Sequence, residues 1–143
     1  MLVVSRERDL WGTPVAVFAA SNLLIGAWML VSPAHWYWNL PANVPGSGPL
    51  NEHFVRDVGC IFFLLGAALA VAVVRPHWRV PAMSAASAFY VAHALVHVLD
   101  TARGLFPPGH WRYDVLGVYL ATLVLVLTTI LLARSRSRTH AGS

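Results

Sequence analysis

The chain has 143 residues, of which 57% are hydrophobic and only 11% are charged, and its mean hydropathy is +0.61. This composition is too apolar and too poor in charge for a soluble domain of this length, so it predicts an integral membrane protein. The formal net charge is +4 and all ten basic residues are arginine, but they lie at the ends of apolar stretches, which argues against nucleic-acid binding.

Four apolar stretches are long enough to cross about 30 Å of hydrocarbon, which takes about 20 helical residues. In chain order they cover roughly 13–32, 54–74, 80–100 and 113–133, and the arginine-rich residues 134–143 follow as a basic tail. The prediction is a single transmembrane domain, an all-α, up-down-up-down four-helix bundle in the lipid bilayer.

The arginines also predict the orientation of this bundle. Those that fall on one side of it are Arg6, Arg8, Arg75, Arg79, Arg134, Arg136 and Arg138. Because positively charged loops stay inside, both termini are expected to be cytoplasmic, with Arg56, Arg103 and Arg112 on the outer side. The basic tail is expected to contact anionic lipid.

The first stretch begins at Thr13-Pro14, a helix-capping residue followed by proline at the first helical position. Asn22 lies near its centre, and a lone amide in hydrocarbon needs a partner, which favours an interhelical hydrogen bond. The aromatic residues 35–38 and a proline- and glycine-rich run follow before Glu52. This connection is either a partial lid over the bundle or an anchor at the membrane interface.

The second and third stretches each carry one narrow polar stripe. At about 100° per residue, each set of side chains falls within an arc of roughly 80° to 100° of its helix. The stripes consist of His53, Arg56, Asp57 and Cys60, and of Tyr90, His93, His97 and Asp100. A short connection makes the two helices antiparallel neighbours, and ionisable groups at membrane depth turn inward and mark functional sites. We therefore predict that the two stripes meet in the outer half of the bundle.

A metal centre is the first function compatible with such a site. His93-x-x-x-His97 places two imidazoles about one turn apart, and Asp57 or Asp100 would complete a set of two histidines and one carboxylate. His53 and Cys60 are further candidate ligands from the facing helix, and these ligand types fit copper, zinc or iron. A variant is haem b, with His53 and either His93 or His97 as axial ligands.

A pocket for a lipophilic redox ligand such as a quinone is the second possibility, with Arg56 as hydrogen-bond donor and a histidine as proton partner. Tyr90, Cys60 and Asn22 would line that pocket. The competing interpretation is a packing subunit, in which Arg56 pairs with Asp57 or Asp100 and the histidines make interhelical hydrogen bonds. The sequence shows no nucleophile and base pair, so an enzyme acting alone ranks third among these interpretations.

The fourth stretch carries almost no polar side chains apart from Asp114, which complements the positive end of its helix dipole. It is expected to be scaffold.

Two segments carry a resemblance to a known family. Residues 51–59 read Asn-Glu-His-Phe-Val-Arg-Asp-Val-Gly, and residues 93–100 read His-Ala-Leu-Val-His-Val-Leu-Asp. In this they resemble small bacterial four-helix membrane proteins of the DoxX-like kind, and DoxX is similar to a membrane subunit of a quinone-reducing oxidoreductase. The resemblance implies a bacterial inner-membrane protein that acts as an accessory component of a membrane complex, beside a membrane-protein partner or as a homo-oligomer. It supplies no catalytic residue.

Overall fold

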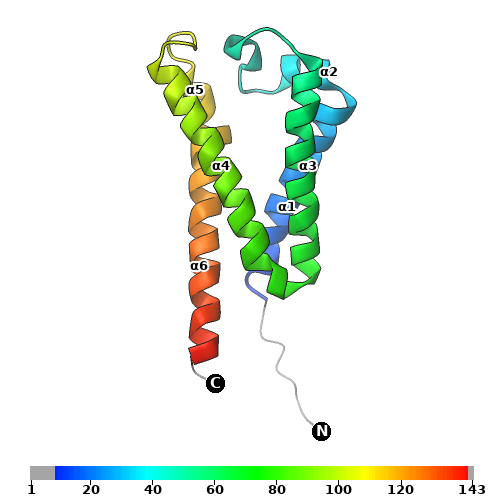
Figure 1. Cartoon of the computed structure of the whole chain (residues 1–143), viewed down its shortest axis with the longest axis vertical. Helices are drawn as coiled ribbons and strands as arrows, with labels where there is room; N and C mark the ends of the chain where they lie inside the picture. The colour runs from blue at the N-terminus through cyan, green and yellow to red at the C-terminus, as the bar shows by residue number, and fades with distance from the viewer. Residues whose placement is uncertain (1–8, 142–143) are drawn as a thin grey trace.

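The computed structural model describes residues 9–141, and these form helices joined by short connections (Figure 1). No strand occurs within that range, which confirms the predicted all-α class. The long helical segments are α1 (Gly12–Val31), α3 (Glu52–Val74), α4 (Arg79–Ala102) and a last segment made of α5 (Trp111–Asp114), the π-helical turn η3 (Val115–Leu120) and α6 (Ala121–Ala141).

Three short helices lie in the connections: α2 (Pro33–Asn39), η1 (Val44–Ser47) and η2 (Pro76–Trp78). Each has proline in its first turn, where the missing backbone N–H is not needed. Asn51 caps the N-terminus of α3, because its side-chain oxygen accepts a hydrogen bond from the backbone N–H of Phe54 at 3.1 Å. The sequence therefore fixes these helix starts locally.

Each long segment has the length and the apolar composition to cross a membrane, so the chain is a multi-pass membrane protein. Large apolar side chains face outward along all four of them, as lipid contact requires; examples are Leu24, Leu64, Val96 and Leu116. The last helix continues to Ala141, so the residues expected as a separate basic tail extend it as far as the structure is described.

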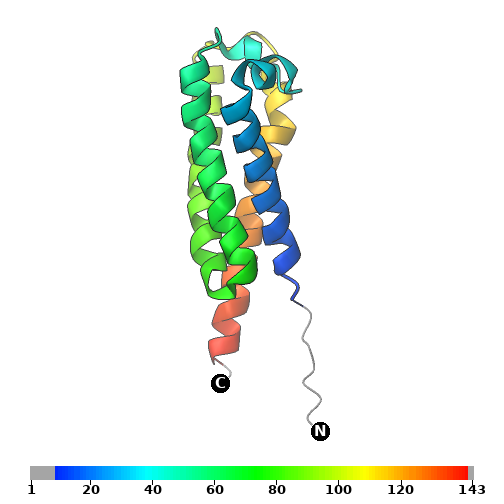
Figure 2. The same cartoon turned by 90° about the vertical axis from the view of Figure 1, so that its right-hand side faces the viewer.

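The helices are arranged as two pairs (Figures 1 and 2). α1 packs along α3 in the most extensive contact of the fold, and α4 packs along α6, whereas α3 and α4 touch much less. In Figure 1 the two pairs lie close together near the α3–α4 connection and diverge toward the opposite end. The apolar core lies where they converge: Val15, Ala19, Leu69, Ala72, Ala82, Met83, Ala86, Leu125 and Leu132.

Glycines allow α1 and α3 to approach closely. A Cβ atom added at Gly26 would lie 2.5 Å from the backbone nitrogen of Phe63, and one added at Gly66 would lie 2.6 Å from the backbone nitrogen of Leu23. No side chain fits at these separations, and small residues are what let membrane helices pack backbone to backbone. The face of α3 that carries Gly66 therefore packs against α1.

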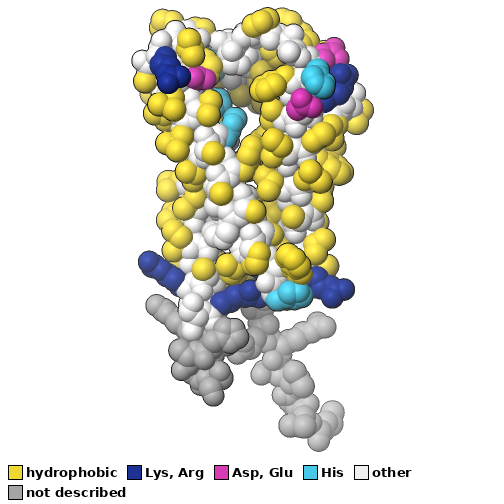
Figure 3. All heavy atoms as spheres, viewed as in Figure 1, with side chains coloured by type: hydrophobic (Ala, Val, Ile, Leu, Met, Phe, Trp, Pro, Cys, Tyr) yellow, Lys and Arg dark blue, Asp and Glu magenta, His cyan; other side chains and the backbone are white. Residues whose placement is uncertain are grey.

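We call the end where α1 begins and α3 joins α4 the terminal end. Arg79 is buried there and donates to both carboxylate oxygens of Asp9, at 2.6 and 2.5 Å, and to the carbonyls of Ala72 and Val73 near the end of α3. Arg136 of α6 donates to the carbonyl of Pro76 in the α3–α4 connection. Arginines gather at this end in Figure 3, and they join the segments of both helix pairs.

Candidate functional site

The predicted stripe on α3 lies on the surface, at the opposite end, which we call the loop end. His53 and Asp57 form an ion pair of 3.5 Å, with 88% and 60% of their side chains exposed. Arg56 donates to Glu52 at 2.9 Å, and both side chains are about half exposed. Cys60 is also exposed. Among the described residues, no hydrogen bond or ion pair links this stripe to α4, so the structure differs from the predicted meeting of the two stripes.

The packing of α3 on α1 explains the difference. The buried residues of α3, such as Val55, Gly59 and Gly66, lie on the face that contacts α1. At 100° per residue, His53 and Asp57 project from the opposite side of the helix. Since the glycine face must meet α1, the polar stripe turns away from the bundle, and each charge finds its partner one turn along the same helix.

The stripe on α4 faces inward, as predicted. The stripe lies on the same face of α4 as Met83 and Ala86, which are buried nearer the terminal end. The rings of His93 and His97 lie edge to face with centroids 4.6 Å apart, and His93 stacks on Phe89 at 5.9 Å. Asp100 lies half-buried in the last turn of the same helix.

The partners of this stripe come from the fourth segment, for which the sequence predicts a scaffold role. Asp114 is the most buried carboxylate of the described chain, with 3% of its side chain exposed, and its Oδ2 lies 3.1 Å from His97 Nδ1. His110, equally buried, places Nε2 3.9 Å from Asp114 Oδ1. We call His93, His97, His110 and Asp114 the buried His/Asp cluster. His110-x-x-x-Asp114 has the same spacing as His53-x-x-x-Asp57, and this was the signal available in the sequence.

Two atoms at the centre of this cluster have unused hydrogen-bonding capacity. His97 Nδ1 and Asp114 Oδ2 are close, but they are not aligned as a hydrogen bond, and neither has another hydrogen-bond partner among the described residues. A buried polar atom left unsatisfied costs about 1–3 kcal/mol, so native structures seldom keep one without a reason. The cluster can therefore accept or donate further hydrogen bonds.

Backbone geometry next to Asp114 is also unusual. η3 begins at the following residue, Val115, and the chain makes π-helical rather than α-helical hydrogen bonds as far as Leu120. Short π-helical insertions are rare and occur often at functional sites, because they rotate the preceding side chains relative to the rest of the helix. Just after the insertion, the Thr122 hydroxyl contacts the carbonyl of Val118 in η3 and that of Tyr90 in α4, at 2.6 and 3.2 Å.

Aromatic side chains line the interior below the cluster. Phe62 of α3 meets Phe89 and Tyr90 of α4 edge to face, with ring centroids 5.3 and 6.0 Å apart. The hydroxyl of Tyr90 donates to Asn22 Oδ1 at 3.3 Å, and the Asn22 amide donates to the Phe18 carbonyl at 2.8 Å. The interhelical role expected for Asn22 is thus confirmed. In Figure 3 the surface is hollowed between the two helix pairs at the loop end, and histidine side chains lie in the hollow.

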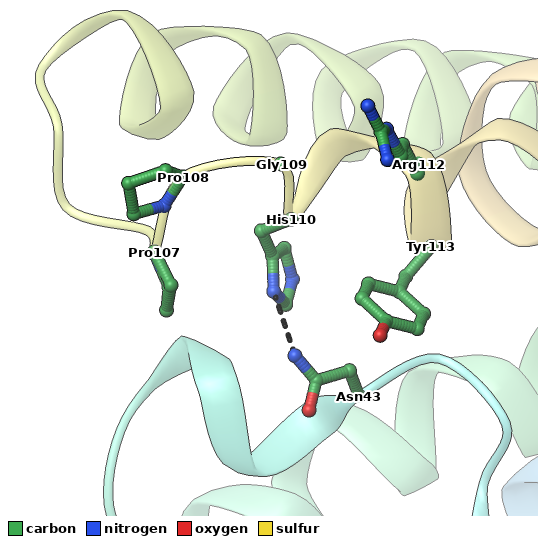
Figure 4. Close-up of a pocket in the computed structure, with 7 residues that line it drawn as sticks. All are labelled: Asn43, Pro107, Pro108, Gly109, His110, Arg112 and Tyr113. Carbon is green, nitrogen blue, oxygen red and sulfur yellow. Dashed lines mark hydrogen bonds between the residues drawn. The ribbon is translucent and has the colours of Figure 1, made fainter.

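A pocket of about 490 Å³ lies above the cluster, where the two outer connections meet (Figure 4). The ring of His110 points toward Asn43 from the α2–α3 connection, and the two nitrogens Nδ1 and Nδ2 are 3.4 Å apart. Tyr113 points to the same side, and Pro107 and Gly109 complete the rim. His110 therefore has one ring nitrogen at this pocket and the other toward the buried carboxylate.

The metal alternatives find no geometric support in residues 9–141, where no three His, Cys, Asp or Glu side chains come together as a metal-holding group. His93 and His97 are adjacent on one helix, and His53, the proposed partner from α3, is exposed and paired with Asp57. Two axial haem ligands must approach the iron from opposite faces. What the cluster offers instead is imidazole donors and acceptors oriented by a buried carboxylate.

Comparison of the chain with protein-family models, with curated proteins and with solved structures gave no match.

Proposed function

We propose that this protein binds a lipophilic ligand with a polar, planar head, such as a quinone, between its two helix pairs at the loop end. The observation that carries the proposal is the unsatisfied pair of buried atoms, His97 Nδ1 and Asp114 Oδ2. A quinone carbonyl would accept a hydrogen bond from His97 Nδ1, and the hydroxyl of the reduced quinone would donate one to Asp114 Oδ2, so each of the two atoms would gain a partner.

The surroundings of that pair favour a flat, apolar molecule. Phe62, Phe89 and Tyr90 offer ring faces and edges, which pack well against another planar ring at 4.5–7 Å. Small-molecule sites are typically apolar with a few polar groups that fix orientation. The hollow between the helix pairs opens on a lateral face of the bundle (Figure 3), from which an isoprenoid tail would extend into lipid.

The orientation in the membrane is part of the proposal. Arg75, Arg79, Arg134 and Arg136 lie at the terminal end, where Asp9 is the one acidic residue among those described, whereas every other acidic residue of that part lies at the loop end. By the positive-inside rule the terminal end is cytoplasmic and the loop end faces outward. Arg6 and Arg8, which supported the same orientation from the sequence, lie outside the described residues, as does the side chain of Arg138.

The resemblance to DoxX-like proteins supports a setting for this binding. We propose an accessory component of the bacterial inner membrane that presents its ligand to a redox enzyme, either beside a membrane-protein partner or as a homo-oligomer. Outward-facing apolar side chains such as Leu64 and Leu116 are available for lipid and for a second protein alike.

A packing subunit without ligand is the second candidate. It is favoured by the interhelical hydrogen bonds that satisfy several polar groups, including Tyr90 with Asn22 and Ser87 with Thr129 at 2.9 Å. In that case the His/Asp cluster would be one more such network.

Ligand binding separates the two candidates. The full-length protein in lipid nanodiscs would be titrated with a short-chain benzoquinone, and quenching of tryptophan fluorescence would report binding. His97→Ala is expected to raise the Kd by about tenfold, since a hydrogen bond of about 1.4 kcal/mol is lost. His53→Ala is the matched control, because His53 is exposed.

Saturable binding that weakens in His97→Ala and not in His53→Ala would support the proposal. Absence of saturable binding to the intact protein would leave the packing subunit. Metal analysis and a visible spectrum of the same preparation test the remaining alternative: stoichiometric metal, or a Soret band, lost in both His93→Ala and His97→Ala would contradict the quinone proposal.

A further inference from the structure

We propose that the buried His/Asp cluster, together with the outer pocket, forms a proton relay from the loop-end surface to the interior of the helix bundle. The relay runs through His110, Asp114, His97 and His93 in that order. It rests on the proposed function for the use of the proton, which would be exchanged with a bound ligand, but the path itself is independent of the ligand.

The relay begins at the outer pocket. His110 contributes to the pocket lining through the nitrogen that faces Asn43, 3.4 Å away, and its other nitrogen faces Asp114 at 3.9 Å. Imidazole accepts a proton at one nitrogen and releases one from the other, and its ordinary pKa lies near neutrality. His110 is thus placed to take a proton from the pocket and pass it inward.

Asp114 joins the two halves of the path. One carboxyl oxygen faces His110 and the other lies 3.1 Å from His97. In its protonated form, Asp114 donates the proton on Oδ2 to His97 Nδ1 while Oδ1 accepts a proton from His110 Nε2, so the carboxyl group remains protonated after the transfer. The step of 3.9 Å is longer than a direct hydrogen bond and requires a rotation of the His110 ring or a bridging water. The unused capacity of Oδ2 and of His97 Nδ1 is what such a transfer needs.

His93 is the inner end of the path. Its ring lies 4.6 Å from that of His97, centroid to centroid, and stacks on Phe89 one turn deeper in the helix. The four side chains therefore lie as successive neighbours from the outer pocket to membrane depth. The exposed pair His53–Asp57 has the same residue types and spacing as His110 and Asp114, but it lies on the surface and outside this series.

Aromatic side chains pack around the cluster. The ring of Phe106 contacts those of His97 and His110, with centroid distances of 5.6 and 4.6 Å. The phenol ring of Tyr113 packs 5.9 Å from that of His110, centroid to centroid.

Exchange of imidazole protons with solvent tests the relay without any ligand. The full-length protein, labelled with ¹⁵N-histidine, would be placed in lipid nanodiscs, and the exchange rates of the His93 and His97 ring N–H groups measured by NMR. Asp114→Asn and His110→Phe, which retain volume, are expected to slow that exchange by about a hundredfold, the low end of what a positioned acid–base group contributes. Asp57→Asn and His53→Phe are the matched controls and should change nothing.

A merely structural role predicts the opposite sign, because a loosened cluster exposes its histidines and accelerates exchange. Unchanged or faster exchange in His110→Phe, in a variant that remains folded and monodisperse, would overturn the relay. If Asp114→Asn fails to fold, Asp114→Glu and His110→Phe decide the question: the glutamate variant should retain most of the exchange and the phenylalanine variant should lose it. Quinone binding that persists in a relay-deficient variant would separate failure of the relay from failure of the proposed function.

Discussion

The two helix pairs each carry a histidine and an aspartate one helical turn apart at the loop end, and the two copies have opposite fates. In the α1/α3 pair, His53 and Asp57 lie on the surface and contact each other alone. In the α4/α6 pair, the equivalent spacing puts His110 and Asp114 in the interior, where both meet residues from other segments. The same local pattern is therefore a solvated ion pair in one place and the core of a candidate site in the other. Burial, rather than spacing, distinguishes them.

The largest expected effect is the stability difference between the two histidines. His110→Ala should lower the free energy of unfolding by about 3 kcal/mol, because it leaves a cavity and removes a neighbour from a buried carboxylate. His53→Ala should change it by less than about 0.5 kcal/mol, since exposed ion pairs contribute little. Reversible unfolding in mixed micelles measures both free energies of unfolding. Equal losses in the two variants would show that burial does not distinguish the two histidines.

The hydrogen bonds of Arg79, which connect the two helix pairs at the terminal end, give the next largest effect. Arg79→Ala should cost about 2 kcal/mol, because Arg79 holds Asp9 and the carbonyls at the end of α3 through hydrogen bonds to a charged group. The exposed Arg75→Ala should be nearly neutral. The same unfolding assay applies, and a neutral Arg79→Ala would show that the pairs are held together by their apolar core alone.

Packing within the α1/α3 pair gives a third test. Gly26→Ala should destabilise the protein by about 1–2 kcal/mol, since the added methyl group would lie 2.5 Å from the backbone nitrogen of Phe63. Gly117→Ala in the other helix pair adds its methyl group to open space and should be neutral or stabilising by up to about 1 kcal/mol. Thermal unfolding of both variants in nanodiscs compares the two environments directly.

Hydroxyl contacts within the α4/α6 pair are expected to contribute less. Thr129→Val removes the hydrogen bond to Ser87 and should cost about 0.6 kcal/mol, the average for such bonds between membrane helices. Thr128→Val is the control, because its hydroxyl donates within its own helix. A double-mutant cycle with Ser87→Ala should return the coupling, and a coupling of zero would assign α4–α6 packing to apolar contact.

The smallest effect is a pH dependence at the terminal end. The hydrogen bond from Arg79 lowers the pKa of Asp9 below its ordinary value. A carboxyl group whose pKa is lower in the folded state stabilises the protein above its unfolded pKa, near 4, and that contribution is lost as the pH falls through the folded value. The melting temperature of the native protein should therefore exceed that of Asp9→Asn at pH 6, and the difference should shrink below about pH 4. A difference that persists at pH 3 would contradict this assignment.

Much of the fold was predictable, because hydrophobic length and helical periodicity are properties of single segments. The apolar stretches and caps predict the four long helices, and the spacing of Tyr90, His93 and His97 predicts that they share one inward face of α4. The partner demanded by Asn22 was also foreseeable, because an amide in hydrocarbon must be satisfied, although that it would be Tyr90 was not.

The tertiary structure decided which polar faces meet. Helical periodicity puts His53 and Asp57 on one side of α3 but does not say which neighbour covers that side. Close backbone contact at Gly26 and Gly66 packs the opposite side of α3 against α1. The polar stripe of α3 consequently faces outward. Asp114 seemed a helix-end charge in the sequence, yet the fold of the last segment buries it beside His97. Periodicity acts within one helix, whereas burial of a charge depends on the packing of several.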